Sequence, residues 1–279
     1  MTSDTMLTST DRFILLDILG LEKNDILPAF SALTDDQKQE FYTKKQRVDE
    51  GYPLDYVLNK TPIGNYTFHI PPTVFIPREE TELILPKLRQ KMDWWMKECK
   101  HNKPEVNGMD MCCGTGFLGI NIADTVNSMW FVDISKEAVK TTTQNIQENS
   151  IQSTRVIHSD LFSSVDLFDV SKNVKDWIFV CNPPYVPEID KKDVVKNNIQ
   201  YEPELALFSG EDGLDFFKQC ISNLNKFEKK PGFIFFELDP RNVQKAFQCF
   251  VERYPGYKAE IWQDCWERER FLVAWIRLN

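Results

Sequence analysis

From about Pro104 to the C-terminus, short apolar segments alternate with longer segments in which apolar residues recur at helical spacing. The apolar segments predict strands at Val106–Met111, Met129–Ile134, Thr154–His158, Trp177–Cys181, Phe233–Leu238, Ala259–Trp262 and Phe271–Arg277. Helices are predicted after the first, second and fourth strands, over Phe117–Val126, Lys136–Glu148 and Gly213–Phe227. Short buried strands separated by helices are typical of an α/β fold with a doubly wound parallel sheet. The last two strands lie close together in the sequence, which favours a hairpin at that edge.

The N-terminal part of the chain has a different pattern. A short helix is predicted over Asp11–Leu19, with Thr10 as its N-cap and Gly20 as its stop signal. A second, polar helix follows Thr34-Asp35, either of which can cap it, and Gly51-Tyr52-Pro53 ends it.

The segment between Ile63 and Phe75 mixes aromatic and β-branched residues with glycine, asparagine and proline, which predicts a hairpin. A long helix is then predicted from about Glu79 to Cys99, leading into the main domain. The chain is therefore expected to have two domains. Residues 1–75 form a small, mostly helical domain with a hairpin, which we expect to recognise a substrate, and residues 76–279 form the α/β domain.

Composition and charge narrow the possible partners. Of the 279 residues, 42% are hydrophobic and 27% are charged, which is typical of a chain with a packed core. The formal net charge is -9 and no basic stripe is visible, which argues against nucleic acid as the main partner. The longest apolar runs are strand-length, so no membrane span is expected.

Cysteine and histidine usage indicates reduced thiols and no metal. The chain has seven cysteines, an odd number, and nothing that resembles a secretory signal, so an intracellular location is expected. Only three histidines occur, and none pairs with cysteines at the spacing of metal ligands. Cys112 and Cys113 are adjacent, whereas zinc sites favour a two-residue spacer.

A glycine-containing turn follows the first strand of the α/β region. The segment begins at Asp110 and continues through Cys112, Gly114 and Gly116 before a predicted helix. Glycines at such a turn let the backbone approach a ligand closely and adopt torsion angles that other residues resist. Alone, this turn is a weak signal, because an ordinary strand-to-helix connection has the same appearance.

Two further strand ends strengthen the prediction of a ligand site. Asp133 ends the second strand, where a carboxylate can accept both hydroxyl protons of a ribose. Asp160 follows the third strand beside Phe162, whose ring could lie against an adenine. Since ligands bind at the carboxyl edge of open α/β sheets, these residues together predict a nucleoside site. Gly119 also completes a G-x-G-x-x-G pattern typical of dinucleotide sites, but the ending of the fourth strand argues against that alternative.

The fourth strand ends in Asn182-Pro183-Pro184-Tyr185. Two successive prolines remove two backbone donors and stiffen the turn. The side-chain carbonyl of Asn182 and the main-chain carbonyl of Pro183 can together accept both N–H bonds of a planar NH2 group. Pro184 and Tyr185 complete the pocket, and Tyr185 supplies a flat face for the target. We expect Asn182, Pro183 and Tyr185 to be the catalytic residues.

This turn is the signature of methyltransferases that act on planar nitrogens, either of DNA adenine or of protein glutamine. Surrounding motifs are more specific, and together they resemble the HemK/PrmC family of glutamine methyltransferases from about residue 13 to the C-terminus. They are Gly51-Tyr52-Pro53-Leu54-Asp55-Tyr56, Ile76-Pro77-Arg78-Glu79-Glu80-Thr81-Glu82, Tyr201-Glu202-Pro203-Glu204-Leu205-Ala206-Leu207 and Gly210-Glu211-Asp212-Gly213-Leu214, followed by Glu237 and Arg270. Glu79 stands where the family has proline, Cys112 where its loop has a first glycine, and Asp239 where a glycine usually follows the acid.

The resemblance implies a Rossmann-like class I methyltransferase domain and S-adenosylmethionine as cofactor. Asp110, Cys112, Gly114, Gly116, Asp133, Asp160, Phe162 and Asn182 are the expected cofactor-binding residues. The implied reaction is methylation of the glutamine amide in the Gly-Gly-Gln motif of a class I peptide chain release factor, by a monomeric enzyme. If Cys112 requires a positive φ, it costs about 1 kcal/mol or slightly more.

Three alternatives remain beside this prediction. A glutamine of a ribosomal protein could be the target of a close relative with the same fold. A DNA adenine methyltransferase would need a basic cleft and a DNA-reading domain, and this chain is acidic. A catalytically inactive adaptor is disfavoured because the Asn182–Tyr185 turn is intact. The first thirty residues hold five acidic and two basic residues, unlike a transit peptide. The expected compartment is the bacterial cytoplasm or, if the protein is eukaryotic, the mitochondrial matrix.

Overall fold

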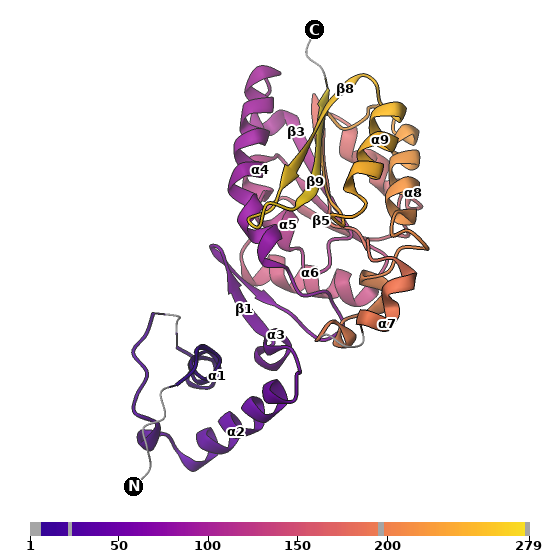
Figure 1. Ribbon diagram of the computed structural model, residues 1–279. Coiled ribbons are helices and arrows are strands. Elements are labelled where there is room, and N and C mark those ends of the chain that lie inside the picture. Colours follow the sequence, from indigo (N-terminus) through magenta and orange to yellow (C-terminus); the bar gives the residue numbers. More distant parts are fainter. Residues whose placement is uncertain (1–6, 22–23, 195–197, 277–279) are drawn as a thin grey trace.

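The computed structural model describes residues 7–21, 24–194 and 198–276. Its main part is a seven-stranded sheet in the order β5-β4-β3-β6-β7-β9-β8, flanked by helices (Figure 1). The strands are β3 (Val106–Met111), β4 (Met129–Asp133), β5 (Thr154–His158), β6 (Asp176–Cys181), β7 (Phe233–Glu237), β8 (Tyr257–Gln263) and β9 (Glu269–Ile276). The predicted strands and the α/β fold class are thereby confirmed, while Arg277, the predicted end of the last strand, lies outside the described residues.

The sheet is not wholly parallel. Strands β5, β4, β3, β6 and β7 pair in parallel, whereas β9 is antiparallel to both β7 and β8. The predicted hairpin is present as β8–β9, but its second strand lies inside the sheet and its first strand forms the edge. This order brings the carboxyl ends of β3, β4, β5, β6 and β7 to one edge of the sheet.

Helices cover both faces of the sheet and form two hydrophobic cores (Figure 1). One face is covered by α4 (Glu79–Glu98), α5 (Phe117–Ile120) and α6 (Lys136–Glu148), the other by α8 (Asp215–Asn223) and α9 (Val243–Arg253). A short helix, α7 (Lys191–Val194), lies outside these layers. The predictions of α4 and α6 are confirmed, and α9 was not predicted. The helices predicted over Phe117–Val126 and Gly213–Phe227 are shorter, because each ends in a separate 3-10 turn.

The N-terminal part consists of α1 (Ser9–Leu19), α2 (Asp35–Asp49), α3 (Leu54–Leu58) and a hairpin of β1 (Lys60–Ile63) and β2 (Tyr66–His69). The helices have their own small core, formed by Ile14, Leu15, Leu33 and Phe41.

Threonine side chains cap the N-termini of both α1 and α2. The predicted cap Thr10 is wrong. Thr8 caps α1, because its Oγ1 accepts from the Asp11 N–H at 3.1 Å and the Asp11 carboxylate accepts from the Thr8 N–H at 2.9 Å. Gly20 ends α1 with φ 63, as predicted, and Thr34 caps α2.

The hairpin packs on the main domain. Phe68 and Ile70 are fully buried in the large core beneath α4 and α5. The Asn145 side chain on α6 accepts from the His69 N–H at 2.7 Å and donates to the His69 carbonyl at 3.1 Å. The division of the chain near residue 75 stays a prediction, and the hairpin is the element that joins the two parts. Within the described residues, no helix is both long and apolar enough to cross a lipid bilayer.

Candidate active site

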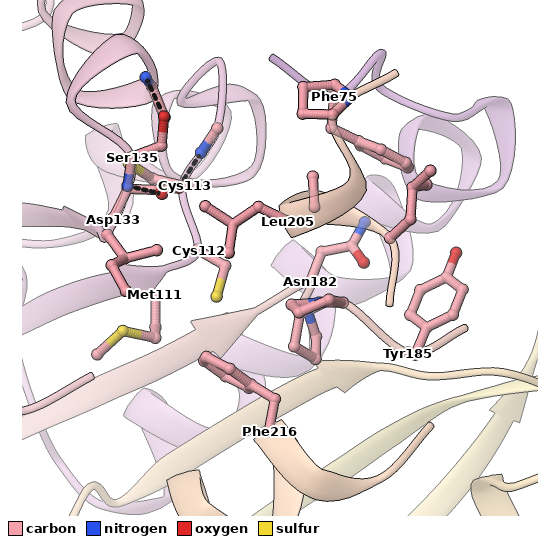
Figure 2. Close-up of a pocket in the computed structure, with 18 of the residues that line it drawn as sticks. Phe75, Met111, Cys112, Cys113, Asp133, Ser135, Asn182, Tyr185, Leu205 and Phe216 are labelled. Carbon is pink, nitrogen blue, oxygen red and sulfur yellow. Dashed lines mark hydrogen bonds between the residues drawn. The ribbon is translucent and has the colours of Figure 1, made fainter. Parts of the chain in front are cut away.

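A cavity of about 580 Å³ opens at the carboxyl edge of the sheet. Most predicted site residues line it: Asp110, Cys112, Gly114, Asp133, Asp160, Asn182, Pro183, Pro184 and Tyr185. Asp133 lies at one end of the cavity and Tyr185 at the other, with Cys112 and Asn182 between them (Figure 2). The volume is in the range of small-molecule and cofactor sites, about 300–1,000 Å³.

Three residues of the turn after β3 have a left-handed backbone conformation. Cys112, Gly114 and Gly116 have φ values of 62, 55 and 79. Cys112 therefore does adopt a positive φ, and this cysteine carries the steric cost that a glycine avoids. Gly116 does not line the cavity. It precedes α5, and a Cβ at this position would lie 3.0 Å from Thr142 Cγ2, so its role is to let the loop pack on α6.

Asp110 and Gly119 form the base of this turn. The Asp110 carboxylate accepts a hydrogen bond from the Gly119 N–H at 2.8 Å, and burial raises the pKa of this carboxyl to about 8. A Cβ on Gly119 would lie 2.4 Å from the Phe131 ring. Gly119 is thus a glycine of close helix–strand packing, and Gly119 is not among the residues that line the cavity.

Asp133 is held by the backbone of the glycine turn. Its Oδ2 accepts from the Gly114 N–H at 3.0 Å and its Oδ1 from the Ser135 N–H at 2.8 Å. Each carboxylate oxygen has a second acceptor site, so the pair can also receive two hydroxyl donors from the cavity. Burial raises the pKa of Asp133, and the backbone donors oppose that rise.

The structure does not support the prediction for Phe162. Asp160 lines the cavity, but the Phe162 side chain is buried in the core, where its ring contacts Phe179 and Phe227. Leu161 lines the cavity in its place and has a left-handed backbone with φ 47.

The Asn182–Tyr185 turn presents a free polar group to the cavity. Within the part of the chain that the structure describes, no hydrogen bond engages the Asn182 side chain, and its carboxamide lies between Leu205 and Tyr185 (Figure 2). The Tyr185 hydroxyl donates to Glu237 Oε1 at 3.3 Å. Burial and the nearby Glu237 charge raise the pKa of Tyr185, which keeps its hydroxyl protonated.

Motifs that are far apart in the sequence support this turn. Arg78 pairs with the buried Glu202 at 2.5 Å, which joins the Ile76–Glu82 and Tyr201–Leu207 segments. Behind the turn, a Cβ on Gly213 would lie 2.2 Å from the Tyr185 carbonyl oxygen, and the φ of Gly213 is 74. Only glycine permits this close approach.

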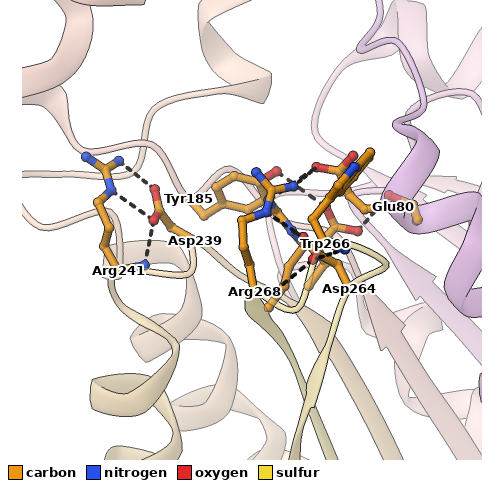
Figure 3. Close-up of polar contacts among 10 residues, drawn as sticks. Glu80, Tyr185, Asp239, Arg241, Asp264, Trp266 and Arg268 are labelled. Carbon is orange, nitrogen blue, oxygen red and sulfur yellow. Dashed lines mark hydrogen bonds and ion pairs between the residues drawn. The ribbon is translucent and has the colours of Figure 1, made fainter.

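The end of β7 and the β8–β9 turn surround Tyr185 with charged groups (Figure 3). Asp239 accepts from the Arg241 guanidinium at 2.6 Å, and Arg241 also pairs with Asp190 at 2.7 Å. The aspartate in place of the usual glycine thus links the β7–α9 loop to the segment after the Asn182–Tyr185 turn. Residue patterns alone indicated neither this link nor the contact between Tyr185 and Glu237. The only indication in the sequence was that Glu237 occupies the position of an acid in the family motif.

Two curated relatives resemble the chain over most of its length. A release factor glutamine methyltransferase of Mycoplasma mycoides is 30% identical over 243 residues, which cover 85% of this chain and 82% of that protein. A ribosomal protein uL3 glutamine methyltransferase of Neisseria meningitidis is 30% identical over 233 residues, which cover 81% and 72%.

The family model "Methyltransferase small domain" matches residues 81–210. Among solved structures, the N-terminal domain of human METTL16 in complex with SAH has a TM-score of 0.55 at 14% identity, covers 100% of this chain and 99% of that one, and shares the fold. Fold and site define the chain as a class I methyltransferase that uses S-adenosylmethionine. Within this class, it belongs to the family of the release factor glutamine methyltransferases.

The residues of the cavity fit this cofactor. Asp133 offers two acceptor oxygens at the end of β4, and the glycine turn leaves open space at Gly114, where a Cβ would meet nothing within 4 Å. Among the described residues, no group of three or more His, Cys, Asp and Glu side chains is arranged to hold a metal ion.

Proposed function

We propose that the chain methylates the side-chain amide nitrogen of the glutamine in the Gly-Gly-Gln motif of a class I peptide chain release factor. One observation carries the proposal: the Asn182 carboxamide faces the cavity without a hydrogen-bonding partner in the described part of the chain, beside the stiff Pro183-Pro184 turn. Asn182 is only partly buried, so its side-chain amide can be reached from the cavity and is free to pair with a ligand that enters it.

The chain's own residues orient the target nitrogen. The Asn182 side-chain oxygen and the Pro183 carbonyl accept the two N–H bonds of the glutamine amide, and the Tyr185 ring packs against its plane. S-adenosylmethionine supplies a methyl group that is already activated by a sulfonium. An amide nitrogen is a poor nucleophile because its lone pair is delocalised, so orientation is the main task, and orientation can contribute roughly 7–11 kcal/mol.

The same two acceptors stabilise the positive charge that develops on nitrogen. The N-protonated amide is strongly acidic, so water can take its proton and no dedicated base is required. On the cofactor side, Asp133 would hold the ribose hydroxyls. Asp110, Cys112, Gly114 and Asp160 would complete that half of the cavity.

A glutamine of ribosomal protein uL3 is the second candidate substrate. The Neisseria meningitidis relative, whose name states that substrate, is as similar in sequence as the relative named for release factors. DNA adenine is disfavoured by the net charge of -9. We infer a monomer that works where bacterial-type translation takes place, in the bacterial cytoplasm or the mitochondrial matrix.

The proposal is tested by incubating the chain with methyl-labelled S-adenosylmethionine and, separately, release factor, uL3 or duplex DNA. We expect label on the glutamine of the release factor, located by mass spectrometry of the Gly-Gly-Gln peptide. A release factor with that glutamine replaced by alanine is the matched control. Label on uL3 or DNA, with none on the release factor, would overturn the proposal.

A further inference from the structure

Glu237, the last residue of β7, is a buried carboxylate behind the Asn182–Tyr185 turn. Its side chain is 0% exposed. Oε1 accepts from the Tyr185 hydroxyl at 3.3 Å, and Oε2 accepts from the Thr81 hydroxyl at 2.7 Å. Both donors are neutral hydroxyls, which is an unusual environment for a buried acid, because buried carboxylates normally face a cation or several backbone donors.

The nearest cation does not form a hydrogen bond with Glu237. Arg270 instead pairs with Glu80 at 3.3 Å and with Asp264 at 3.2 Å. Arg268 is held by the same Asp264 at 2.8 Å (Figure 3), and Arg78 is held by Glu202. The positive charges around Tyr185 are therefore largely matched by other acids. Glu237 depends on its two hydroxyl donors, and burial raises its pKa to about 7.

We propose that Glu237 is a positioning residue that acts through Tyr185: by accepting from its hydroxyl, Glu237 fixes the ring against the substrate amide. This inference rests on the proposed function of the Asn182–Tyr185 turn. Thr81 lies in the first turn of α4, within the Ile76–Glu82 segment whose Arg78 pairs with Glu202. Glu237 thus connects the end of β7 with the start of α4, through Thr81, and with the Asn182–Tyr185 turn, through Tyr185.

The protonation state of Glu237 changes the strength of this contact. The ionised carboxylate makes charge-assisted hydrogen bonds, which are roughly twice as strong as neutral ones. When Glu237 is protonated, its contact with Tyr185 becomes neutral and the ring is held less firmly. Turnover at saturating cofactor should therefore fall as the pH drops through about 7. The charged or titratable groups that face Glu237 are Glu80, Arg270 and Tyr185.

Glu237→Gln tests the inference, because glutamine keeps the shape but is neutral at every pH. We expect a roughly tenfold lower kcat at pH 8, the difference between a charged and a neutral hydrogen bond. Cofactor affinity should be unchanged and the pH dependence near 7 should disappear. The control is Asp176→Asn. Asp176 is a buried acid at the amino end of β6, so it lies at the end of the strand opposite to the cavity. This variant should affect stability without changing kcat.

Tyr185→Phe tests the same contact from its other side, and this test does not depend on whether the Glu237 variant folds. Removing the hydroxyl should lower kcat by a similar factor and abolish the same pH dependence. In the double variant, Glu237→Gln should have little further effect, because the two residues act as one unit. Additive losses, or a pH dependence that survives in Tyr185→Phe, would overturn the inference. Failure of the wild type to methylate any glutamine substrate would instead contradict the proposed function.

Discussion

The Asn182 side chain has no hydrogen-bonding partner among the described residues, whereas the Asp133 carboxylate is held by two backbone N–H groups. If the Asn182 oxygen accepts one N–H of the substrate amide, Asn182→Ala removes an interaction needed most in the transition state. The loss of one positioned acceptor typically costs about 2.7–4 kcal/mol, so kcat should fall roughly a hundred- to a thousandfold. Cofactor affinity, measured by calorimetry, should stay nearly the same.

Asn182→Asp distinguishes acceptance from orientation. Aspartate keeps an acceptor oxygen, so it should retain more activity than alanine if acceptance alone matters. If the asparagine amide must also donate a hydrogen bond, both variants should be equally poor. Near wild-type turnover of Asn182→Ala would mean that the turn is only structural.

Asp133 belongs to the cofactor half of the cavity. Asp133→Ala should weaken S-adenosylmethionine binding by about 1–3 kcal/mol, the range for charge-assisted hydrogen bonds. Because Asp133 also accepts from the Gly114 N–H, part of the loss should come from a looser glycine turn. Asp133→Asn keeps one acceptor and should lose less. Unchanged affinity in a folded Asp133→Ala variant, measured by calorimetry, would remove this residue from the site.

At the scale of elements, the apolar pattern locates strands well and pairing partners poorly. The strands β3 and β5 and the helix α6 begin and end where the sequence predicts. Helix α9 has buried Val243, Ala246 and Phe250 at helical spacing, but Asn242 before it makes no side-chain cap, so the usual start signal is absent. The insertion of β9 between β7 and β8 could not be predicted, because local patterns do not specify which strands pair.

The candidate site was predictable where it depends on strand ends and not where it depends on tertiary contacts. Strand ends bring Asp110, Asp133 and Asn182 to one cavity. Phe162 lies in the turn that follows β5, where Leu161 has a left-handed φ of 47, so strand alternation no longer predicts which side chain faces the cavity. A non-glycine residue with positive φ has no clear sequence signal.

Helix α6 anchors the hairpin through Asn145, whose side chain is 0% exposed. It bonds the His69 N–H and carbonyl and also donates to the Thr115 carbonyl at 2.8 Å. Asn145→Ala leaves the buried Thr115 carbonyl and the partly buried His69 backbone groups without these partners, so we expect about 2–4 kcal/mol lower stability in urea unfolding. Gln147→Ala, on the exposed face of α6, is the matched control and should change stability by less than about 0.5 kcal/mol. Equal stability of the two variants would contradict this anchoring role.

At the scale of the whole molecule, the N-terminal helices and the catalytic domain have separate cores, and the chain passes between them at α3. Leu54 and Leu58 pack on the small core, whereas Tyr56 is buried in the large one, where its hydroxyl donates to the Val74 carbonyl at 2.6 Å. Removing residues 1–76 would strip Tyr56, Phe68 and Ile70 from the large core. Removing residues 1–50 would leave that core intact.

A chain that begins at Gly51 therefore separates substrate recognition from folding. We propose that the N-terminal helices recognise the protein substrate, because their polar composition and separate core set them apart from the cavity. The shortened chain should bind S-adenosylmethionine with wild-type affinity and methylate a short Gly-Gly-Gln peptide at the wild-type rate. Its KM for the intact release factor should rise at least tenfold, which corresponds to about 1.4 kcal/mol of lost binding. Equal activity of both chains on the intact release factor would show that these helices do not recognise it, and loss of cofactor binding would show that they support the fold of the catalytic domain.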